Sequence, residues 1–348
     1  MMLRRKPLPQ APRVGMSHQS DLAVVACHFN WAGFKRPVEN LCRFLRHMQW
    51  AGVPVYGYEL QPEGRSFVTE GNPLWKRAVV GDQHMLFQKE QCINHIVDSL
   101  PPHITKIAWV DADLEFSNRD VFRVASSMLD TMACVQLFTE AVWTDHAGAV
   151  TTRRRACVLT GMDNRWLGHP GFAWAARREL FSDLGGLYSI TPLGSGDTIF
   201  ACAITGGVIL DRNKNKTGVG VNTTAHDQWA SRVFAWAKGR LGTVAGECWH
   251  MWHGDRKLRK YAQRNDALVT FDGTKHISIS KRLGVLEWTH DTPECPKQYT
   301  RDYFINRQED TPSWATSDSQ PTGIAISPSI GKPTFRIVTG KQIGRAHV

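Results

Sequence analysis

The sequence lacks any informative cysteine spacing: its eight cysteines are scattered, and no two of them form a C-x-x-C pair. Neither a zinc site nor a disulfide scaffold is therefore indicated. Several cysteines stand in apolar runs, such as Cys27 at the end of residues 23–27. This pattern predicts buried, reduced thiols and a cytoplasmic protein.

Long hydrophobic runs are also absent. The longest uncharged apolar stretch, residues 198–210, is far shorter than the ~20 residues that a membrane-spanning helix needs. The basic residues 4–6 are followed by Pro7 and Pro9 rather than by an apolar segment, which excludes a secretory signal. We therefore expect a soluble protein without a membrane span.

The net charge is positive, but it is unevenly distributed along the chain. The 348 residues carry a formal charge of +10, which raises the prospect of a polyanionic partner such as nucleic acid. Residues 1–20 contribute +4 and residues 311–348 contribute +3, which leaves only +3 for residues 21–310. A basic nucleic-acid-binding protein is an alternative, and deletion of the two ends should then abolish the binding. Because the central region carries only +3, we expect no nucleic-acid partner.

Composition divides the chain into three parts. Residues 1–20, rich in proline and arginine, predict a disordered basic arm, and residues 311–348, rich in serine, threonine and proline, predict a disordered tail. Residues 21–310 are expected to form the folded domain. The last six residues, 343–348, can be encoded by a string that matches a widely used sequencing adapter, and we hypothesise that they are not biological.

The first half of the folded region alternates between apolar runs and segments of helical spacing. The pattern predicts strands at residues 22–27, 53–60 and 105–110, and helices at residues 38–48 and 86–97. Such alternation favours an α/β fold with a mostly parallel sheet flanked by helices. Sheets of this kind bind ligands beyond the carboxyl ends of their strands, where Asn30 and Asp111 stand.

The second half has fewer regular signals. Residues 144–168 are polar and arginine-rich and predict a mobile loop. The alanines and the leucine within residues 171–180 predict a helix, and the apolar run that Asp197 opens and that extends through Ile204 predicts another.

The sharpest local signal is a pair of carboxylates, Asp111 and Asp113, at the end of the predicted strand 105–110. If the chain turns there, both side chains can face one pocket. Hard oxygen ligands of this kind suit Mg²⁺ or Mn²⁺, which in turn hold a diphosphate. The alternative is a strand-end turn in which an aspartate caps the next segment.

Two longer runs resemble the two halves of a GT-A glycosyltransferase. Residues 88–116 contain, in order, Q-K-E, N, L-P and A-W-V-D-A-D, and resemble the donor-nucleotide half. Residues 168–197 contain G-H-P-G-F-A-W-A-A-R-R, G-G-L and G-S-G-D, and resemble the C-terminal region of galactosyltransferases.

The resemblance covers residues 22–265, and it is carried by the order and spacing of several motifs together. It implies a GT-A (nucleotide-diphospho-sugar transferase) fold, similar to family 2 glycosyltransferases with a galactosyltransferase-like C-terminal half. The nucleotide-binding half would be residues 21–140, and the acceptor half residues 141–310.

The resemblance also implies a metal and a nucleotide sugar. Asp113 would bind Mn²⁺ or Mg²⁺ directly, Asp111 would reach the ribose or a metal-bound water, and the metal would bridge the diphosphate of a UDP-sugar. Asn30, Lys89 and Asn94 are candidates for nucleotide contacts. For Lys89 the alternative is a solvated helix face.

His250 and His253 stand three residues apart, ahead of a basic stretch. Galactosyltransferases of this type have a methionine and a histidine at this spacing, both on the manganese. The resemblance therefore implies that His253, with His250 in place of the methionine, completes the metal site, since neutral imidazole is a good ligand. The alternative is that the two histidines only pack among Trp249 and Trp252.

Asp197 would be the general base that takes the proton of the acceptor hydroxyl in a single displacement, which makes the enzyme inverting. In galactosyltransferases an acidic residue usually precedes this aspartate, but here the position is Gly196. The alternative role, compatible with the first, is an N-cap for the helix that begins at Thr198.

The sequence thus predicts a metal-dependent, inverting glycosyltransferase that moves a hexose from a UDP-sugar to a hydroxyl acceptor. It identifies neither the acceptor nor the oligomeric state. The alternative enzyme is a sugar-phosphate nucleotidyltransferase. That class should have a glycine-rich basic loop after the first strand, and residues 28–31, H-F-N-W, are not such a loop.

Overall fold

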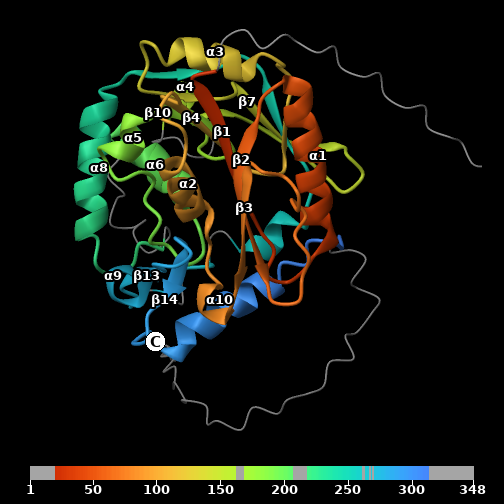
Figure 1. Cartoon of the computed structure of the whole chain (residues 1–348), viewed down its shortest axis with the longest axis vertical. Helices are drawn as coiled ribbons and strands as arrows, with labels where there is room; N and C mark the ends of the chain where they lie inside the picture. The colour runs from red at the N-terminus through yellow and green to blue at the C-terminus, as the bar shows by residue number, and fades with distance from the viewer. Residues whose placement is uncertain are drawn as a thin grey trace, which may run out of the picture.

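The computed structural model describes residues 20–161, 168–206, 218–260, 263–265, 268 and 270–312 (Figure 1). The predicted arm and tail, with the last six residues, lie outside this part of the chain, apart from Ser20, Thr311 and Pro312.

A seven-stranded sheet forms the centre of the molecule. In the order of the sheet its strands are β11 (Leu241–Thr243), β6 (Cys134–Gln136), β10 (Ala173–Arg177), β4 (Lys106–Val110), β1 (Leu22–Phe29), β2 (Val55–Pro62) and β3 (Trp75–Val80). All neighbouring strands pair in parallel except β10, which is antiparallel to both β4 and β6. The predicted α/β fold with a mostly parallel sheet is confirmed.

Helices cover both faces of this sheet, which explains why β1 is apolar at successive positions. Val24 and Ala26 belong to the core on one face, and Ala23 and Val25 to the core on the other. The first face carries α1 (Lys35–Ala51) and α3 (Val121–Met128), and the second carries α2 (Lys89–Asp98), α5 (Glu179–Ser182), α6 (Gly196–Thr205) and α8 (Thr224–Ala237) (Figure 1). The helices predicted at 38–48, 86–97 and 197–204 correspond to α1, α2 and α6.

The helix predicted within residues 171–180 is mostly wrong. Ala173–Arg177 form β10, and only the short α5 follows it. Ala173, Ala175 and Ala176 are buried between β4 and β6. The high helix propensity of alanine is overruled by strand pairing on both sides, where small side chains fit a covered sheet.

A second sheet brings distant parts of the chain together. Its strands, in order, are β5 (Leu114–Phe116), β12 (Glu247–His250), β7 (Glu140–Thr144), β8 (Val150–Ala156) and β9 (Gly168–His169). The antiparallel pairing of β12 with β5 sets His250 opposite Leu114, directly after Asp113.

The mobile loop predicted at residues 144–168 is wrong at residues 150–160, whereas residues 145–149 form a turn. Residues 150–156 form β8, paired with β7, and α4 (Cys157–Thr160) follows. Residues 153–155 are consecutive arginines, so their side chains alternate between the two faces of the sheet. Arg153 bonds Glu140 on the neighbouring β7 and Glu247 on the next strand, β12. Cross-strand ion pairs thus stabilise a strand that carries few apolar residues. Residues 162–167 lie outside the described part.

The C-terminal part adds a smaller third core around Leu86, Phe271 and Trp288. It contains α9 (Gly273–His276), the hairpin β13 (Ile277–Ile279) and β14 (Leu286–Trp288), and α10 (Glu294–Ile305); the short helices η1 (Asp82–His84) and η2 (Arg256–Arg259) complete the described elements. In Figure 1 the hairpin and α10 lie together at one end of the molecule.

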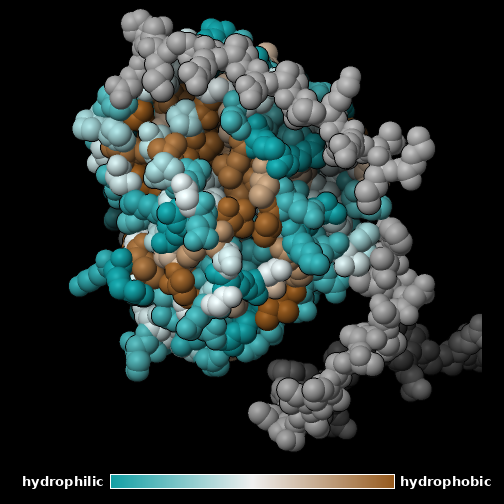
Figure 2. Space-filling model, turned by 45° about the vertical axis from the view of Figure 1, so that its right-hand side comes forward, coloured by the Kyte–Doolittle hydropathy of each residue, from teal (hydrophilic) through white to brown (hydrophobic). Residues whose placement is uncertain are grey.

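On the face shown in Figure 2, hydrophobic residues form a band bordered by hydrophilic ones. Among the described residues, no helix combines the length and the apolar character needed to span a bilayer.

Candidate functional site

Four segments that are distant in the sequence meet beyond the end of β4. They are the loop after β4, the starts of α2 and α6, and the residues at and after the end of β12. They contribute the following predicted side chains: Asp111 and Asp113, Lys89, Asp197, His250 and His253.

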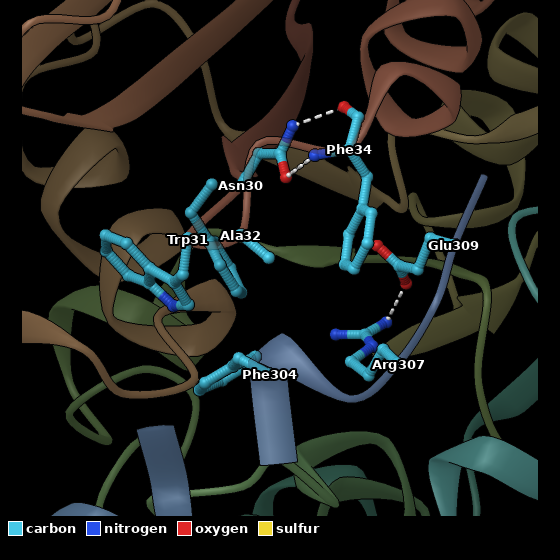
Figure 3. Close-up of a pocket in the computed structure, with 8 residues that line it drawn as sticks. Asn30, Trp31, Ala32, Phe34, Phe304, Arg307 and Glu309 are labelled. Atoms are coloured by element: carbon cyan, nitrogen blue, oxygen red, sulfur yellow. Dashed lines mark hydrogen bonds and ion pairs between the residues drawn. The ribbon is translucent and has the colours of Figure 1, made fainter. Parts of the chain in front are cut away.

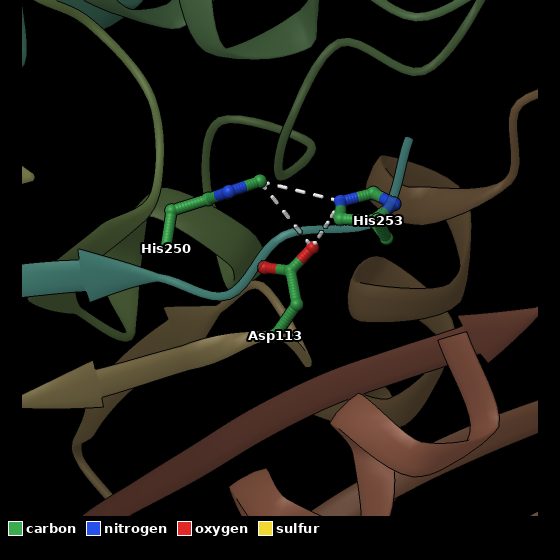
Figure 4. Close-up of side chains that lie close together, drawn as sticks. All are labelled: Asp113, His250 and His253. Atoms are coloured by element: carbon green, nitrogen blue, oxygen red, sulfur yellow. Dashed lines mark hydrogen bonds and ion pairs between the residues drawn. The ribbon is translucent and has the colours of Figure 1, made fainter. Parts of the chain in front are cut away.

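Asp113, His250 and His253 form a compact group, with one potential ligand atom from each within 4.8 Å of the others. The Asp113 Oδ2 atom lies 2.8 Å from Nε2 of His253 and 3.6 Å from Nε2 of His250. The two Nε2 atoms are 3.3 Å apart. Figure 4 shows the three side chains converging on one point. A carboxylate and two imidazoles in this arrangement are suited to a divalent cation.

The electrostatics of this group also suit a cation. Burial lowers the pKa of His250 to about 3, so its imidazole is neutral, which is the form that binds metals. Burial alone would raise the pKa of Asp113, but His250, His253 and Arg259 hold it well below its usual range. The other oxygen of Asp113, Oδ1, is buried and has no hydrogen-bond partner among the described residues. A buried anionic oxygen without a partner is unfavourable unless a ligand completes it, so the donor set fits a metal.

Aromatic packing holds His250 in place. The Phe172 ring stacks on the His250 ring, with centroids 5.2 Å apart and an interplanar angle of 15°. Phe172 has a φ of 78°, which is rare for a bulky residue. Its carbonyl accepts the N–H of Asp111 at 3.0 Å. This turn thus links His250 to the loop that bears both aspartates.

Lys89 joins the two predicted carboxylates Asp111 and Asp197. Its Nζ donates to Oδ1 of Asp111 at 2.9 Å and to Oδ1 of Asp197 at 2.7 Å. The lysine is only 8% exposed, so the solvated helix face proposed as an alternative is wrong. Burial alone would lower its pKa, but the two carboxylates raise the pKa of Lys89 well above its usual value.

Asp197 lies in the first turn of α6, which begins at Gly196. The N-cap position belongs to Ser195, with a φ of 88°. The capping role considered for Asp197 is therefore wrong: its Oδ1 bonds Lys89.

Glu90 is an unpredicted member of this cluster. It is buried, and neither carboxylate oxygen has a hydrogen-bond partner among the described residues. Burial raises the pKa of Glu90 to about 7, and Lys89, 4.0 Å away, only partly opposes this. A Cβ atom at Gly196 would lie 2.0 Å from the Glu90 Oε1 atom. Residue 196 therefore has no side chain because the Glu90 carboxyl group occupies that space.

The structure does not bring Asn30 and Asn94 into the cluster. The Asn30 side chain accepts the N–H groups of Gly33 and Phe34, each at 3.0 Å, and donates to the Phe34 carbonyl (Figure 3). It therefore closes the turn into α1. Asn94 bonds both the N–H and the carbonyl of Leu187, each at 2.8 Å. The nucleotide contacts expected of both residues stay predictions.

A cavity of about 350 Å³ opens beside the two histidines. Its other lining side chains include two tryptophans and three cations: Trp143, Trp252, Arg256, Lys257 and Arg259. The Arg256 guanidinium lies over the Trp143 ring, 5.0 Å from its centroid. Cations and aromatic faces beside the group of Asp113, His250 and His253 form a pocket suited to a phosphorylated ligand that carries a ring.

Glu309 is the second contact that sequence reasoning missed. Its Oε1 atom lies 2.9 Å from Nδ1 of His253. Burial alone would raise the pKa of Glu309, but Arg307, His253 and Arg259 lower it to about 2. No local pattern could have identified this residue, since its partner is 56 positions away. Glu90, by contrast, adjoins Lys89 within the Q-K-E motif, and could have been noticed there.

No protein-family model matches the chain, and no curated protein matches its sequence. Several solved structures resemble it in part. The catalytic domain of Drosophila β1,4-galactosyltransferase 7, in complex with xylobiose, is 17% identical with a TM-score of 0.32. The match covers 53% of this chain and 61% of that chain, which is less than two-thirds of the galactosyltransferase domain.

Glucosyl-3-phosphoglycerate synthase from Mycobacterium tuberculosis, solved with Mn²⁺, UDP-glucose and phosphoglyceric acid, is 12% identical with a TM-score of 0.37, over 77% of this chain and 86% of that one. A putative glucose-1-phosphate thymidylyltransferase from Bacillus anthracis is 9% identical with a TM-score of 0.34, over 75% and 98%. Such values do not identify a function, so the function proposed below rests on the residues of the site itself.

The buried Glu90 predicts a pH-dependent stability. Its carboxyl group has a pKa of about 7 in the folded chain, above its usual 4.5. The folded state therefore holds a proton that the unfolded state has lost, and Glu90 destabilises the fold increasingly as the pH rises from 4.5 through 7. Glu90→Gln should gain stability over wild type across this window, by roughly 3 kcal/mol at most.

Chemical denaturation of both proteins at pH 5 and pH 8 measures this difference. Glu63→Gln changes an exposed glutamate on the surface and is the control. A stability difference between Glu90→Gln and wild type that does not change with pH would contradict the assignment.

The contact between Gly196 and Glu90 predicts non-additive mutations. Gly196→Ala should lower the free energy of unfolding by roughly 1–3 kcal/mol, because the new methyl group overlaps the Glu90 carboxyl group. In a Glu90→Ala background the same change should cost much less. A thermal or denaturant double-mutant cycle gives the coupling, and strictly additive losses would show that the two positions do not compete for space.

Proposed function

We propose that this chain is a metal-dependent, inverting glycosyltransferase of the GT-A fold that moves a hexose from a UDP-sugar to a hydroxyl acceptor. The observation that carries the proposal is the meeting of two clusters in one site: Asp113, His250 and His253 on one side, and Lys89 with Asp111 and Asp197 on the other. A cationic pocket adjoins the first cluster.

Asp113, His250 and His253 would hold the metal. The mixed carboxylate and imidazole set favours Mn²⁺ over Mg²⁺, which prefers oxygen ligands. When bound, the ion supplies Lewis-acid stabilisation of the charge that builds up on a departing nucleoside diphosphate. Arg256, Lys257 and Arg259 line the adjacent cavity and would attract the same phosphates.

Asp197 would remove the acceptor proton. Lys89 donates to Oδ1 of this aspartate, and Oδ2 faces the backbone at Gly171. A single base without a separate nucleophile supports one displacement with inversion. Asp111, bonded to the same lysine, would orient the donor.

The rival assignment, a sugar-phosphate nucleotidyltransferase, has less support. Such an enzyme needs a basic phosphate-binding loop after β1, and the turn at that place is closed by the Asn30 side chain on its own backbone. The cationic pocket lies beside His250 and His253 instead. A cytoplasmic location and a role without nucleic acid are part of the proposal.

The metal assignment is tested by titrating UDP with and without Mn²⁺. We expect Mn²⁺-dependent UDP binding in the wild type and a loss of at least about tenfold in Asp113→Ala, since one ligand of three is removed. Asp120→Asn, an exposed carboxylate before α3, is the control. UDP binding that is independent of metal and unchanged in Asp113→Ala would defeat the assignment.

The base assignment has a separate test. Asp197→Asn should keep Mn²⁺-dependent UDP binding, while hydrolysis or transfer of the sugar from UDP-sugars falls by roughly 10²–10⁴-fold. Turnover of a panel of UDP-sugars by the two proteins measures this. Undiminished turnover in Asp197→Asn would remove Asp197 from the mechanism without affecting the metal site.

A further inference from the structure

After α10, the last helix of the described residues, the chain returns to the group of Asp113, His250 and His253. Beyond α10, the Asp310 carboxylate accepts the backbone N–H groups of Lys35 at 2.9 Å and Arg36 at 2.7 Å. These residues open α1, whose own N-cap residue makes no capping side-chain bond. Asp310 therefore caps α1 from the opposite end of the described chain, which fixes residues 306–310 at this place.

The loop that carries His253 packs directly against this segment. Gly254 has a φ of 84°, and a Cβ atom there would lie 3.0 Å from the Glu309 Cα and 3.1 Å from the Arg307 carbonyl oxygen. Both the backbone conformation and the lack of space require glycine. The backbone at Gly254 and the backbone of residues 307–309 are thus in contact, beside the group of Asp113, His250 and His253.

At this contact, Glu309 and Asp113 lie on opposite sides of the His253 ring. The Glu309 Oε1 atom is 2.9 Å from Nδ1, and the Asp113 Oδ2 atom is 2.8 Å from Nε2. Glu309 is only 6% exposed, so water competes little for this bond. Arg307 bonds the same carboxylate at 2.6 Å (Figure 3) and balances its charge.

This geometry selects the tautomer of His253. An ionised carboxylate can only accept, so the hydrogen bond to Glu309 places a proton on Nδ1. The nitrogen that can offer a lone pair to a metal is then Nε2, which faces Asp113. A guanidinium nitrogen of Arg259 lies 2.6 Å from Nε2 and 2.7 Å from Nδ1. Because a guanidinium can only donate, Nε2 is the nitrogen that accepts from it in this tautomer. A carboxylate in this position also fixes the ring orientation and makes the imidazole a stronger ligand.

We propose that Glu309 is the outer-sphere partner of His253: a positioning residue that holds Nδ1–H and directs Nε2 to the metal. The inference rests on the proposed metal site, and it makes the segment after α10 part of that site.

A purely structural ion pair is the competing explanation. Arg307 and Arg259 also lie beside the Glu309 carboxylate, at 2.6 and 3.7 Å, so removing Glu309 would destabilise the segment under either explanation. The quantities that distinguish the two are the affinity for Mn²⁺ and the position of the proton on His253.

The experiment measures Mn²⁺ binding to the full chain by electron paramagnetic resonance of the free ion, without nucleotide. Glu309→Ala should bind Mn²⁺ about 10–100-fold more weakly than wild type. Glu309→Gln, whose amide oxygen can still accept from Nδ1, should recover part of this loss. Glu39→Ala, which removes an exposed glutamate of α1, should bind like wild type, and circular dichroism confirms folding of each variant.

Three results would overturn the proposal. Wild-type affinity in a folded Glu309→Ala would leave only a structural ion pair. Equal losses in Glu309→Ala and Glu309→Gln would indicate that the carboxylate binds the metal directly.

The third result comes from the ¹⁵N chemical shifts of the His253 ring in the metal-free protein. A lone pair on Nδ1 in the wild type would refute the tautomer, whereas a protonated Nδ1 that is lost in Glu309→Ala supports it. This readout holds even if no Mn²⁺ binds, a result that would refute the proposed metal site but not the Glu309–His253 contact.

Discussion

The buried ammonium group of Lys89 is the interaction on which the site depends. It lies between Asp111, which follows β4, and Asp197, in the first turn of α6. Among the described strands, no pairing joins these two parts of the chain directly. Removing one partner from a buried ion pair leaves an uncompensated charge and costs about 3–5 kcal/mol. The lysine thus stabilises the meeting of the two segments, and it opposes the rise that burial causes in the pKa of Asp111.

The charge balance around Lys89 explains why this region is suited to ligands rather than to stability alone. One ammonium group faces three carboxyl groups, those of Asp111, Asp197 and Glu90, and burial raises the pKa of both Asp111 and Glu90. A core selected for stability alone would not keep a buried carboxyl group without a hydrogen-bond partner. Such unsatisfied groups are common where a substrate or a metal completes the arrangement.

Much of the architecture could be predicted from local patterns. The apolar runs and helical spacing gave β1, β2, β4, α1, α2 and α6, because buried parallel strands and amphipathic helices have distinct periods. β10 and β8 could not be predicted in this way. The alanines of β10 have a high helix propensity, and the arginines of β8 suggest an exposed loop. Both become strands only because neighbouring strands pair with them.

The candidate site shows the same contrast between what the sequence reveals and what only the fold determines. Asp113 and His253 were predicted from separate motifs, and the pairing of β12 with β5 brings them within 2.8 Å. Asn30 and Asn94 had equally suitable side chains, but their amides bond nearby backbone groups, which a sequence pattern does not reveal. Residue type identifies what a side chain can bind, whereas only the fold decides which partner it meets.

Gly196 is a further example in which the fold, and not the local sequence, determines which side chains meet. In the resemblance to galactosyltransferases an acidic residue is expected before Asp197, and its absence suggests that Asp197 stands alone. In space it does not: the Glu90 carboxyl group lies where a side chain of residue 196 would begin. Gly196 is in a helical turn and needs no unusual backbone conformation, so close packing by Glu90 is the physical reason for glycine there. An acid missing from one motif is thus present in the site, supplied by the start of another helix.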